Sequence, residues 1–317
     1  MTNSSSEFEL IAEFFAPLAT SPGAFGLKDD VALVAARAGH DLVVTTDVIV
    51  AGVDFFANDP PAVIAKKALR VNLSDLAAKG AGPFGYLLNL MLPAEIGRPF
   101  LKDFAAGLES DQKEFAISLL GGDMSGTPGP LAISITAFGH VPTGRIVRRG
   151  GARVGDLVFV TGTVGDSGGG LALLQNPAVS ASVETRARLI ARYHVPEPRV
   201  TFAPALRAAS AAIDVSDGLL ADLGHIADAS GVRIELEAER IPLSPSLIEL
   251  WGGGSEAIVR AATAGDDYEV AFTARSPITD AHTAVTRIGK VTKGSGIALL
   301  DTEGREIAVP RKGFAHF

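Results

Sequence analysis

Residues 211–220, Ala-Ala-Ile-Asp-Val-Ser-Asp-Gly-Leu-Leu, predict a buried strand that runs directly into a helix. Residues 211–215 are apolar except for Asp214, as in a strand that is covered on both faces. A helical apolar pattern follows over residues 217–229. Asp214 and Asp217 therefore lie at the carboxyl end of a strand, which is where ligands bind in open α/β sheets. The stretch predicts both the fold class and the place of its chemistry.

The same pattern, a short apolar run followed by an aspartate, recurs along the chain. Residues 42–47 read Leu-Val-Val-Thr-Thr-Asp, and residues 117–123 read Ile-Ser-Leu-Leu-Gly-Gly-Asp. Asp30 and Asp75 belong beside them, and Asp75 lies in a predicted helix, where aspartate is a poor helix former. A single aspartate of this kind is often a helix cap or turn residue, but that explanation fits the whole set poorly.

Carboxylates from distant parts of the chain that meet in one place repel one another unless a cation lies among them. Mg²⁺ binds carboxylate oxygens and water, usually alongside substrate phosphates. We therefore expect the aspartates to be metal ligands, and we assign no residue as a general acid or base. Glycines around Asp123 and after Asp217 would let backbone N–H groups donate to a phosphate.

Strands and helices alternate along the chain, which predicts an α/β (or α+β) fold with two domains of similar size. A stretch rich in glycine and arginine at residues 144–155 marks the boundary, and we divide the chain into residues 1–148 and 149–317. The second domain should contain a mixed sheet flanked by helices. The predicted helices cover residues 6–18, 59–79, 100–108 and 217–229, with three more between residues 171 and 210. The predicted strands cover residues 31–35, 42–46, 84–92, 116–120, 131–141, 157–161, 211–215, 232–236, 269–273 and 286–291, with loops at residues 23–26 and 165–170.

Composition and missing motifs limit the functions that the chain can have. The 317 residues are 47% hydrophobic and carry a net charge of −8, which disfavours a nucleic-acid partner. There is no cysteine, so disulfides, thiolate zinc sites and thiol nucleophiles are excluded. No secretory signal or membrane-spanning apolar run is found, and we expect a soluble cytoplasmic protein with no membrane partner. Walker, dinucleotide-binding, protein-kinase and G-x-S-x-G motifs are absent, and the six histidines lack zinc spacing.

Seven short motifs, in order, resemble those of the thiamine-monophosphate kinase family, which belongs to the aminoimidazole ribonucleotide synthetase-like superfamily. They are residues 26–30 (Gly-Leu-Lys-Asp-Asp), 45–47 (Thr-Thr-Asp), 67–80 (Lys-Ala-Leu-Arg-Val-Asn-Leu-Ser-Asp-Leu-Ala-Ala-Lys-Gly), 120–123 (Leu-Gly-Gly-Asp), 150–156 (Gly-Gly-Ala-Arg-Val-Gly-Asp), 212–218 (Ala-Ile-Asp-Val-Ser-Asp-Gly) and 265–269 (Gly-Asp-Asp-Tyr-Glu). The resemblance runs from about residue 7 to residue 317. The absence of cysteine argues against the selenophosphate synthetase and hydrogenase-maturation members of the superfamily.

The resemblance implies that the γ-phosphoryl group of ATP is transferred to thiamine monophosphate, giving thiamine diphosphate and ADP, with several Mg²⁺ ions as cofactors. It implies a homodimer that pairs its N-terminal sheets, with ATP near that interface. Residues 1–148 would bind ATP and Mg²⁺ and form the dimer, and residues 149–317 would complete the nucleotide and substrate site. The implied metal ligands are Asp30, Thr45, Thr46, Asp47, Asp75, Asp123, Asp214 and Asp217. The implied ATP contacts are Gly122, Asp123, Arg149 and Ser216, and the implied substrate contacts are Asp54, Asp266 and Phe314, the last by stacking.

Three departures from the family pattern concern mainly the acceptor side. Asp54 stands where the family has a substrate-contacting histidine, Gly126 stands where it has an arginine, and Lys28 replaces a glycine. Two alternatives therefore stay open: a sibling ATP-using enzyme with another acceptor, and a degenerate ATP-binding regulatory paralogue. A phosphate monoester is largely ionised at pH 7, so its phosphorylation needs positioning and charge stabilisation more than a strong base.

Overall fold

The computed structural model describes residues 7–313 and divides into two compact units. The first unit comprises the described residues up to Leu76 together with Ala81–Gly144. The second comprises Ala77–Gly80 and the described residues from Arg145 onward. No helix among the described residues is long and apolar enough to cross a membrane.

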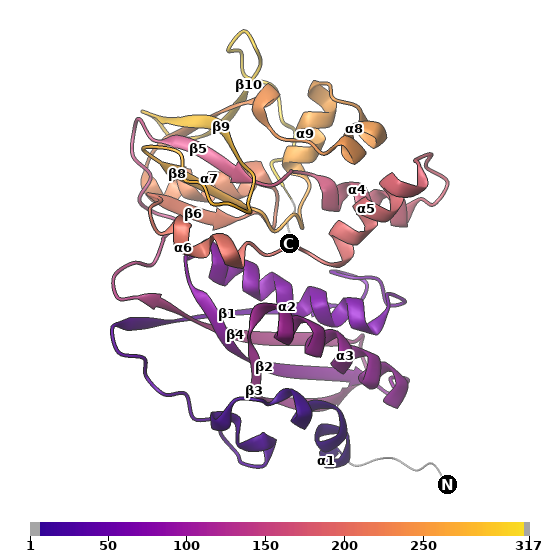
Figure 1. Cartoon of the computed structure of the whole chain (residues 1–317). Coiled ribbons are helices and arrows are strands. Elements are labelled where there is room, and N and C mark those ends of the chain that lie inside the picture. The colour runs from indigo at the N-terminus through magenta and orange to yellow at the C-terminus, as the bar shows by residue number, and fades with distance from the viewer. Residues whose placement is uncertain (1–6, 314–317) are drawn as a thin grey trace. The chain divides into compact units, whose positions relative to one another are not determined.

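The first unit is built on a four-stranded mixed sheet with the strand order β1-β4-β2-β3 (Figure 1). Its strands are β1 (His40–Val50), β2 (Gly82–Pro93), β3 (Ser118–Thr127) and β4 (Ala132–Pro142). β4 pairs antiparallel with both β1 and β2, whereas β2 and β3 are parallel. Parallel neighbours need a crossover connection, and α3 (Arg98–Phe115) supplies it, while α2 (Pro61–Ala78) connects β1 to β2.

Helices cover one face of this sheet, and the other face is open. Along β4, buried residues alternate with half-exposed ones, as expected for a strand with one covered face. On β1 the side chains of Leu42, Val44 and Val48 are 52%, 53% and 54% exposed, whereas Val43 and Ile49 are buried. The prediction of a buried strand at residues 42–46 is therefore right about the strand and wrong about the burial of Leu42 and Val44.

A buried ion pair fixes α2 against α3. Arg70 of α2 donates to both carboxylate oxygens of Asp111 of α3, at 2.7 and 2.8 Å, and also to Glu114 at 2.7 Å. Arg70 is 6% exposed and Asp111 is fully buried, so each charge depends on the other for compensation. The pair sets the position of the helix that carries Asp75.

The second unit contains a six-stranded mixed sheet with the order β10-β7-β9-β5-β8-β6 (Figure 1). Among the described strands of this sheet, β10 and β7 are the one parallel pair. The strands are β5 (Leu157–Thr161), β6 (Ala211–Asp214), β7 (Arg233–Glu237), β8 (Val270–Ala274), β9 (Val285–Thr292) and β10 (Gly296–Leu300). The helices are α4 (Asp166–Gln175), α5 (Val183–His194), α6 (Ala203–Leu206), α7 (Leu219–Ser230), α8 (Pro245–Trp251) and α9 (Ser255–Thr263). The predicted mixed sheet flanked by helices is confirmed.

Side chains of this sheet take part in two separate apolar cores. One joins Leu223 and Ile226 of α7 to Ile213 of β6 and Ile234 of β7. In the other, the stacked rings of Phe159 and Phe272 lie 5.2 Å apart between their centroids. Burial of apolar area of this extent is the main stabilising contribution to such a unit.

Several local predictions are wrong. Residues 31–35 form no strand, and Val31 and Leu33 are each 66% exposed. The glycine-rich residues 165–170 are not a loop, because α4 begins at Asp166. Glycine is needed there for close packing: a Cβ on Gly170 would lie 2.2 Å from the carbonyl oxygen of Leu189 in α5. β10, α8 and α9 were not predicted.

The predicted first helix is present but irregular. It runs as α1 (Glu7–Leu10), a π-helical turn (Ile11–Phe15) and a 3₁₀ turn (Ala16–Leu18). The start proposed for it at residue 6 lies outside the described residues. The predicted loop at residues 23–26 lies within a 3₁₀ segment (Pro22–Leu27) that is kinked at Phe25 and Gly26.

Candidate active site

Thr45, Asp47 and Asp75 come together in the first unit. Thr45 and Asp47 have the same alternation as the buried residues of β1, so their side chains lie on the helix-covered face. The Thr45 hydroxyl donates to the carboxylate of Asp75 in α2. Burial, together with the negative charges of Asp75 and Asp54, raises the pKa of Asp47 to about 6. A bound cation would relieve this repulsion.

Asp54 closes a turn beside this cluster. Its carboxylate accepts a hydrogen bond of 2.7 Å from the backbone N–H of Val50, and its own N–H donates to the Val50 carbonyl at 2.9 Å. The buried ammonium of Lys67 in α2 donates to the Asp54 carbonyl at 2.8 Å. Asp54 is thus a fixed charge near Asp47, and Lys67 is a buried cation that the sequence interpretation did not assign.

Thr46 lies on the opposite face of β1. Its hydroxyl donates to the carbonyl of Ile135 at 3.1 Å and accepts from the hydroxyl of Thr136, also at 3.1 Å. The structure therefore does not bring the Thr46 side chain to Asp47. Only the backbone carbonyl of Thr46 is left as a candidate metal ligand.

Asp47 and Asp123 lie inside strands and not at their ends, because β1 and β3 continue beyond them. Asp123 is exposed and pairs in register with Asn89 of β2. Gly122 has a φ of 152°, and a Cβ there would lie 1.8 Å from the carbonyl oxygen of Leu88, so the strand requires glycine. Asp30 is exposed in a segment without regular structure. The contacts among the described residues do not join Asp30 or Asp123 to Asp47.

In the second unit, Asp214, Ser216 and Asp217 lie where β6 turns into α7. Asp214 is 5% exposed and is the last residue of β6, which ends one residue before the predicted boundary at residue 215. Asp217 does not cap the helix, because the N-cap residue is Gly218 and no side chain caps it. Asp217 is therefore free of the structural role that competes with metal binding in this position.

Asp222, in the first turns of α7, accepts hydrogen bonds from three consecutive backbone N–H groups. Those of Ser216, Asp217 and Gly218 each lie 3.1 Å from the same carboxylate oxygen of Asp222. The expectation that the backbone after Asp217 donates to a phosphate is therefore wrong, because an internal carboxylate already occupies these donors. Sequence reasoning missed Asp222 since it treated this segment only as a helix.

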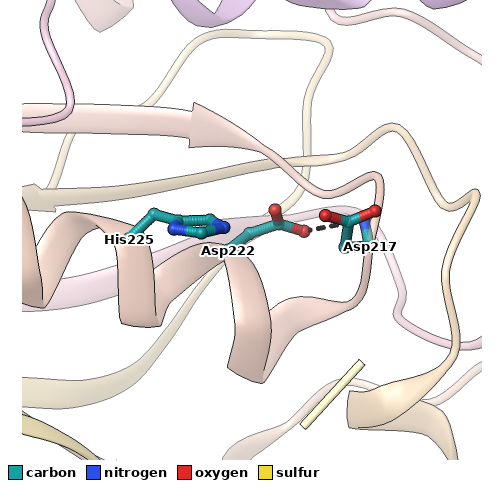
Figure 2. A group of neighbouring side chains, drawn as sticks. All are labelled: Asp217, Asp222 and His225. Atoms are coloured by element: carbon teal, nitrogen blue, oxygen red, sulfur yellow. Dashed lines mark hydrogen bonds between the residues drawn. The ribbon is translucent and has the colours of Figure 1, made fainter. Parts of the chain in front are cut away.

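Figure 2 shows that Asp217, Asp222 and His225 lie side by side, the last two from one face of α7. One candidate ligand atom from each of the three lies within 4.8 Å of the others. Burial and the charge of Asp217 raise the pKa of Asp222 to about 7, although its three N–H bonds act in the opposite direction. His225 is exposed, and its i, i+3 spacing from Asp222 is the sequence signal that could have indicated that the two side chains lie together.

Asp266 is tied to the same loop through the backbone. Its N–H donates to the Ser216 carbonyl at 2.8 Å, and the Tyr268 N–H donates to the Val215 carbonyl at 2.8 Å. Asp266 and Tyr268 have φ values of 66° and 51°, a left-handed conformation that non-glycine residues seldom adopt. Such strain persists only where surrounding contacts fix it, and it is common in binding sites.

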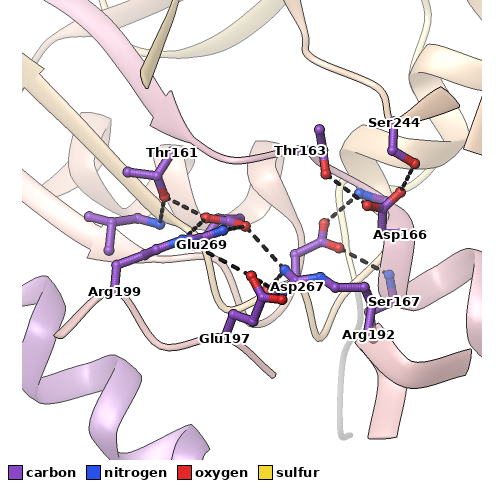
Figure 3. A network of polar contacts seen from close by, with 12 residues as sticks. Thr161, Thr163, Asp166, Ser167, Arg192, Glu197, Arg199, Ser244, Asp267 and Glu269 are labelled. Carbon is purple, nitrogen blue, oxygen red and sulfur yellow. Dashed lines mark hydrogen bonds and ion pairs between the residues drawn. The ribbon is translucent and has the colours of Figure 1, made fainter. Parts of the chain in front are cut away.

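A buried polar network fixes one end of this strained segment (Figure 3). The carboxylate of Glu269 accepts from the Thr161 hydroxyl at 2.6 Å, from Arg199 at 2.6 Å and from Arg192 at 3.1 Å. Thr161 in turn accepts from the Val270 N–H at 2.8 Å. Glu269 is fully buried, so its charge is compensated inside the protein.

Asp267 fixes the middle of the segment against α4. Its carboxylate accepts from the backbone N–H groups of Gly165 at 2.6 Å and Ser167 at 3.2 Å (Figure 3). Burial raises the pKa of Asp267 well above its ordinary value, against the opposing effect of these bonds and of Arg192. Asp267 therefore acts as a buried structural group between the candidate site residue Asp266 and the N-terminus of α4.

Arg149 does not join the Ser216 loop. The Arg149 carbonyl accepts from the hydroxyl of Ser230, at the C-terminal end of α7. A helix of 12 residues is about 18 Å long, so Arg149 is far from the loop at the other end of α7. Arg149 is exposed, and Phe314 lies outside the described residues.

The oxygen-rich donor sets fit Mg²⁺. Each unit offers carboxylates that are crowded enough to have a raised pKa, together with hydroxyl or carbonyl oxygens nearby. Hard cations prefer such ligands, whereas thiolates are absent from the chain.

The chain is similar to known proteins over nearly its whole length. Residues 28–141 match the family described as AIR synthase related protein, N-terminal domain, and residues 153–301 match the corresponding C-terminal domain. The chain is 42% identical to a thiamine-monophosphate kinase of Caulobacter vibrioides, over 98% of this chain and 90% of that one. It is 38% identical to a thiamine-monophosphate kinase of Escherichia coli K12, over 98% of each. A solved structure of AaThiL complexed with AMPPCP and TMP has a TM-score of 0.80 and 34% identity, and covers 93% of this chain and 97% of that one.

Proposed function

Since this chain belongs to the thiamine-monophosphate kinases of the AIR synthase-related family, we propose that it transfers the γ-phosphoryl group of ATP to thiamine monophosphate. The observation that carries the proposal is the full-length similarity to a structure that holds an ATP analogue together with TMP. Because ATP is the co-substrate, we expect the enzyme to work in the cytoplasm.

The proposal assigns the aspartates to Mg²⁺. The cluster of Thr45, Asp47 and Asp75 supports this assignment, since the pKa of Asp47 is raised to about 6 by burial and by its acidic neighbours. When bound, Mg²⁺ would neutralise charge on the two phosphates that must approach each other. The proposed metal ligands are Asp30, Thr45, Thr46, Asp47, Asp75, Asp123, Asp214 and Asp217, with Thr46 acting through its backbone carbonyl.

The protein's own groups would do the positioning. Gly122, Asp123, Arg149 and Ser216 are proposed to contact ATP, and Asp54, Asp266 and Phe314 to contact the acceptor. The strained backbone at Asp266, fixed by its bond to Ser216, supports a binding role for that residue. A monoester phosphate is already largely ionised at neutral pH, so no side chain has to remove a proton from it. The proposed functional division remains residues 1–148 and 149–317.

The proposal includes a homodimer that pairs the open faces of the N-terminal sheets. Leu42, Val44 and Val48 expose more than half of their side chains on one face of β1. The row continues on the neighbouring strands with Phe138 and Phe84, whose rings lie 6.3 Å apart. Contiguous apolar surface of this kind is usual at subunit interfaces.

The deciding experiment incubates the protein with ATP, Mg²⁺ and thiamine monophosphate, and measures thiamine diphosphate by chromatography. We expect product in proportion to enzyme, and none in the presence of EDTA. Turnover of ATP with another phosphate monoester alone would favour a sibling enzyme, for which the fixed charge of Asp54 near Asp47 is the supporting observation. Binding of ATP with no product from any acceptor would favour a regulatory paralogue.

A further inference from the structure

Asp222 lies behind the loop that carries the proposed nucleotide and metal ligands. It is 2% exposed and reaches back from α7 toward residues 216–218 (Figure 2). Nothing in the family motifs or in the assigned site residues gives Asp222 a role. One oxygen of its carboxylate nevertheless accepts hydrogen bonds from three successive N–H groups of this loop.

Three successive N–H groups that converge on one point form the kind of concave site that usually binds an anion such as phosphate. Here the anion is part of the chain. With its donors occupied, the loop cannot use them for a phosphate, and the groups it has left for a ligand are the Asp217 carboxylate and the Ser216 hydroxyl. The loop would attract an anion through its free N–H groups, but with the carboxylates of Asp222 and Asp217 in place it attracts a cation instead.

The loop is fixed from its other side as well. The Ser216 carbonyl accepts from Asp266 at 2.8 Å, and a Cβ on Gly218 would lie 3.1 Å from the Thr263 carbonyl oxygen. Gly218 has a φ of 126°, a conformation that residues with a side chain rarely adopt, so the path of this turn depends on glycine. Without Asp222, one buried donor and two partly buried donors would lose their acceptor, which is costly, and the loop would have to rearrange.

We propose that Asp222 is a positioning residue, which fixes residues 216–218 by accepting their three N–H groups and thereby aims Ser216 and Asp217 at Mg-ATP. The role of the loop toward Mg-ATP rests on the proposed function. The fixing of the loop itself does not, and it is tested separately.

The first test measures hydrogen exchange of the backbone by mass spectrometry, without any ligand. In Asp222→Ala, exchange at residues 216–218 should be faster by about tenfold or more, while β8 stays protected as in the wild type. Asp222→Asn keeps an acceptor oxygen and should stay within about threefold of the wild type. Asp228→Asn, an exposed residue of the same helix, is the matched control and should change nothing. Unchanged exchange in Asp222→Ala would overturn the proposal.

The second test measures kinetics with ATP and thiamine monophosphate. In Asp222→Ala the KM for ATP should rise by about ten- to a hundredfold, while kcat and the acceptor KM stay within about threefold, because ground-state and transition-state binding are lost together. Asp222→Asn should restore most of the affinity. If Asp222→Asn were as impaired as Asp222→Ala, Asp222 would act through its charge as a metal ligand, and the proposal would be wrong. Absence of product from the wild type would refute the proposed function, and the exchange measurement would still decide the role of Asp222.

Discussion

The carbonyl oxygen of Ser216 accepts a hydrogen bond of 2.8 Å from the backbone N–H of Asp266. One residue is a proposed ATP contact and the other a proposed acceptor contact, so the two substrates would be recognised by loops that share a backbone bond. Gly265 allows this approach, because a Cβ at that position would lie 2.5 Å from the same carbonyl oxygen.

Gly265→Ala should therefore impair recognition of both substrates. The added methyl group pushes the two loops apart, and we expect the KM values for ATP and for thiamine monophosphate to rise together, by about five- to fiftyfold. Steady-state kinetics with each substrate varied in turn measures this. Gly254→Ala, where a Cβ would meet nothing within 4 Å, is the matched control. An increase in only one KM would show that the bond does not couple the loops.

Asp75→Asn should nearly abolish turnover without unfolding the protein. The variant removes an anionic ligand from the cluster with Asp47, and the Thr45 hydroxyl can still donate to the new amide oxygen. We expect kcat/KM to fall by about a hundredfold or more, with a melting temperature close to that of the wild type. Asp103→Asn, an exposed residue of α3, should behave as the wild type. Normal activity in Asp75→Asn would remove Asp75 from the site.

Asp54→Asn should improve binding of the acceptor. On the proposal that Asp54 contacts the acceptor, the substitution removes a negative charge near its phosphate, while the amide oxygen can still accept from the Val50 N–H and keep the turn. A charge change of this kind is worth about 1–3 kcal/mol, so the KM for thiamine monophosphate should fall by about five- to a hundredfold. The KM for ATP serves as the internal control and should not change. An unchanged acceptor KM would show that Asp54 is only a turn residue.

The metal-free protein should lose stability as the pH rises from about 4 to about 7. Burial and neighbouring charges raise the pKa of Asp47 from 3.8 to about 6 and that of Asp222 to about 7. A folded-state pKa above the unfolded value favours the protonated folded form, so this stability is complete below about pH 4 and is lost as the pH rises through the folded-state pKa values. For Asp47 the shift corresponds to roughly 3 kcal/mol.

Melting temperatures measured in EDTA between pH 5 and pH 8 check this, in the wild type and in Asp47→Asn. As the pH rises, the melting temperature of Asp47→Asn should increase relative to that of the wild type. Mg²⁺ binds the ionised carboxylates, and its stabilising effect on the wild type should therefore be larger at pH 8 than at pH 5. A pH-independent difference between the two proteins would contradict the raised pKa of Asp47.

Val44→Lys should weaken the dimer. Val44 is 53% exposed on the open face of the first sheet, and a charge placed in an apolar interface costs several kcal/mol unless it is paired. We expect the wild type to be a dimer at micromolar concentration. The dimer dissociation constant of Val44→Lys, measured by analytical ultracentrifugation, should be at least about a hundredfold higher than that of the wild type. Val183→Lys, 88% exposed on α5, is the control. A monomeric wild type with full activity would refute the proposed assembly.

The sequence was sufficient to predict the strands and helices that have a clear apolar period. It also predicted that Asp47 of β1 and Asp75 of α2 lie in one cluster, because crowded aspartates in an apolar chain indicate a shared metal site. The alternation of a strand already implied that Thr46 and Asp47 face opposite ways, and the position-by-position assignment from the family ignored this.

Contacts between distant segments could not be predicted in the same way. Glycines at residues 165–170 are typical of a loop, yet Gly170 is needed where α4 crosses α5 closely. Asp222 has the sequence context of an ordinary helix residue, and its role depends on the path of residues 216–218 in three dimensions. The apolar residues 31–35 suggested a strand, but they find no partner strand among the described residues.

The buried network around Glu269 has a consequence for the order of folding. Its partner Thr161 is 108 residues away in the chain, and the bonds from Asp267 to Gly165 and Ser167 span 102 and 100 residues. Closing loops of this length costs entropy before any contact is gained. The left-handed backbone at Asp266 and Tyr268 can therefore be fixed only after β5, α4 and α5 have assembled. Residues 265–269 should be among the last parts of the second unit to become native during refolding.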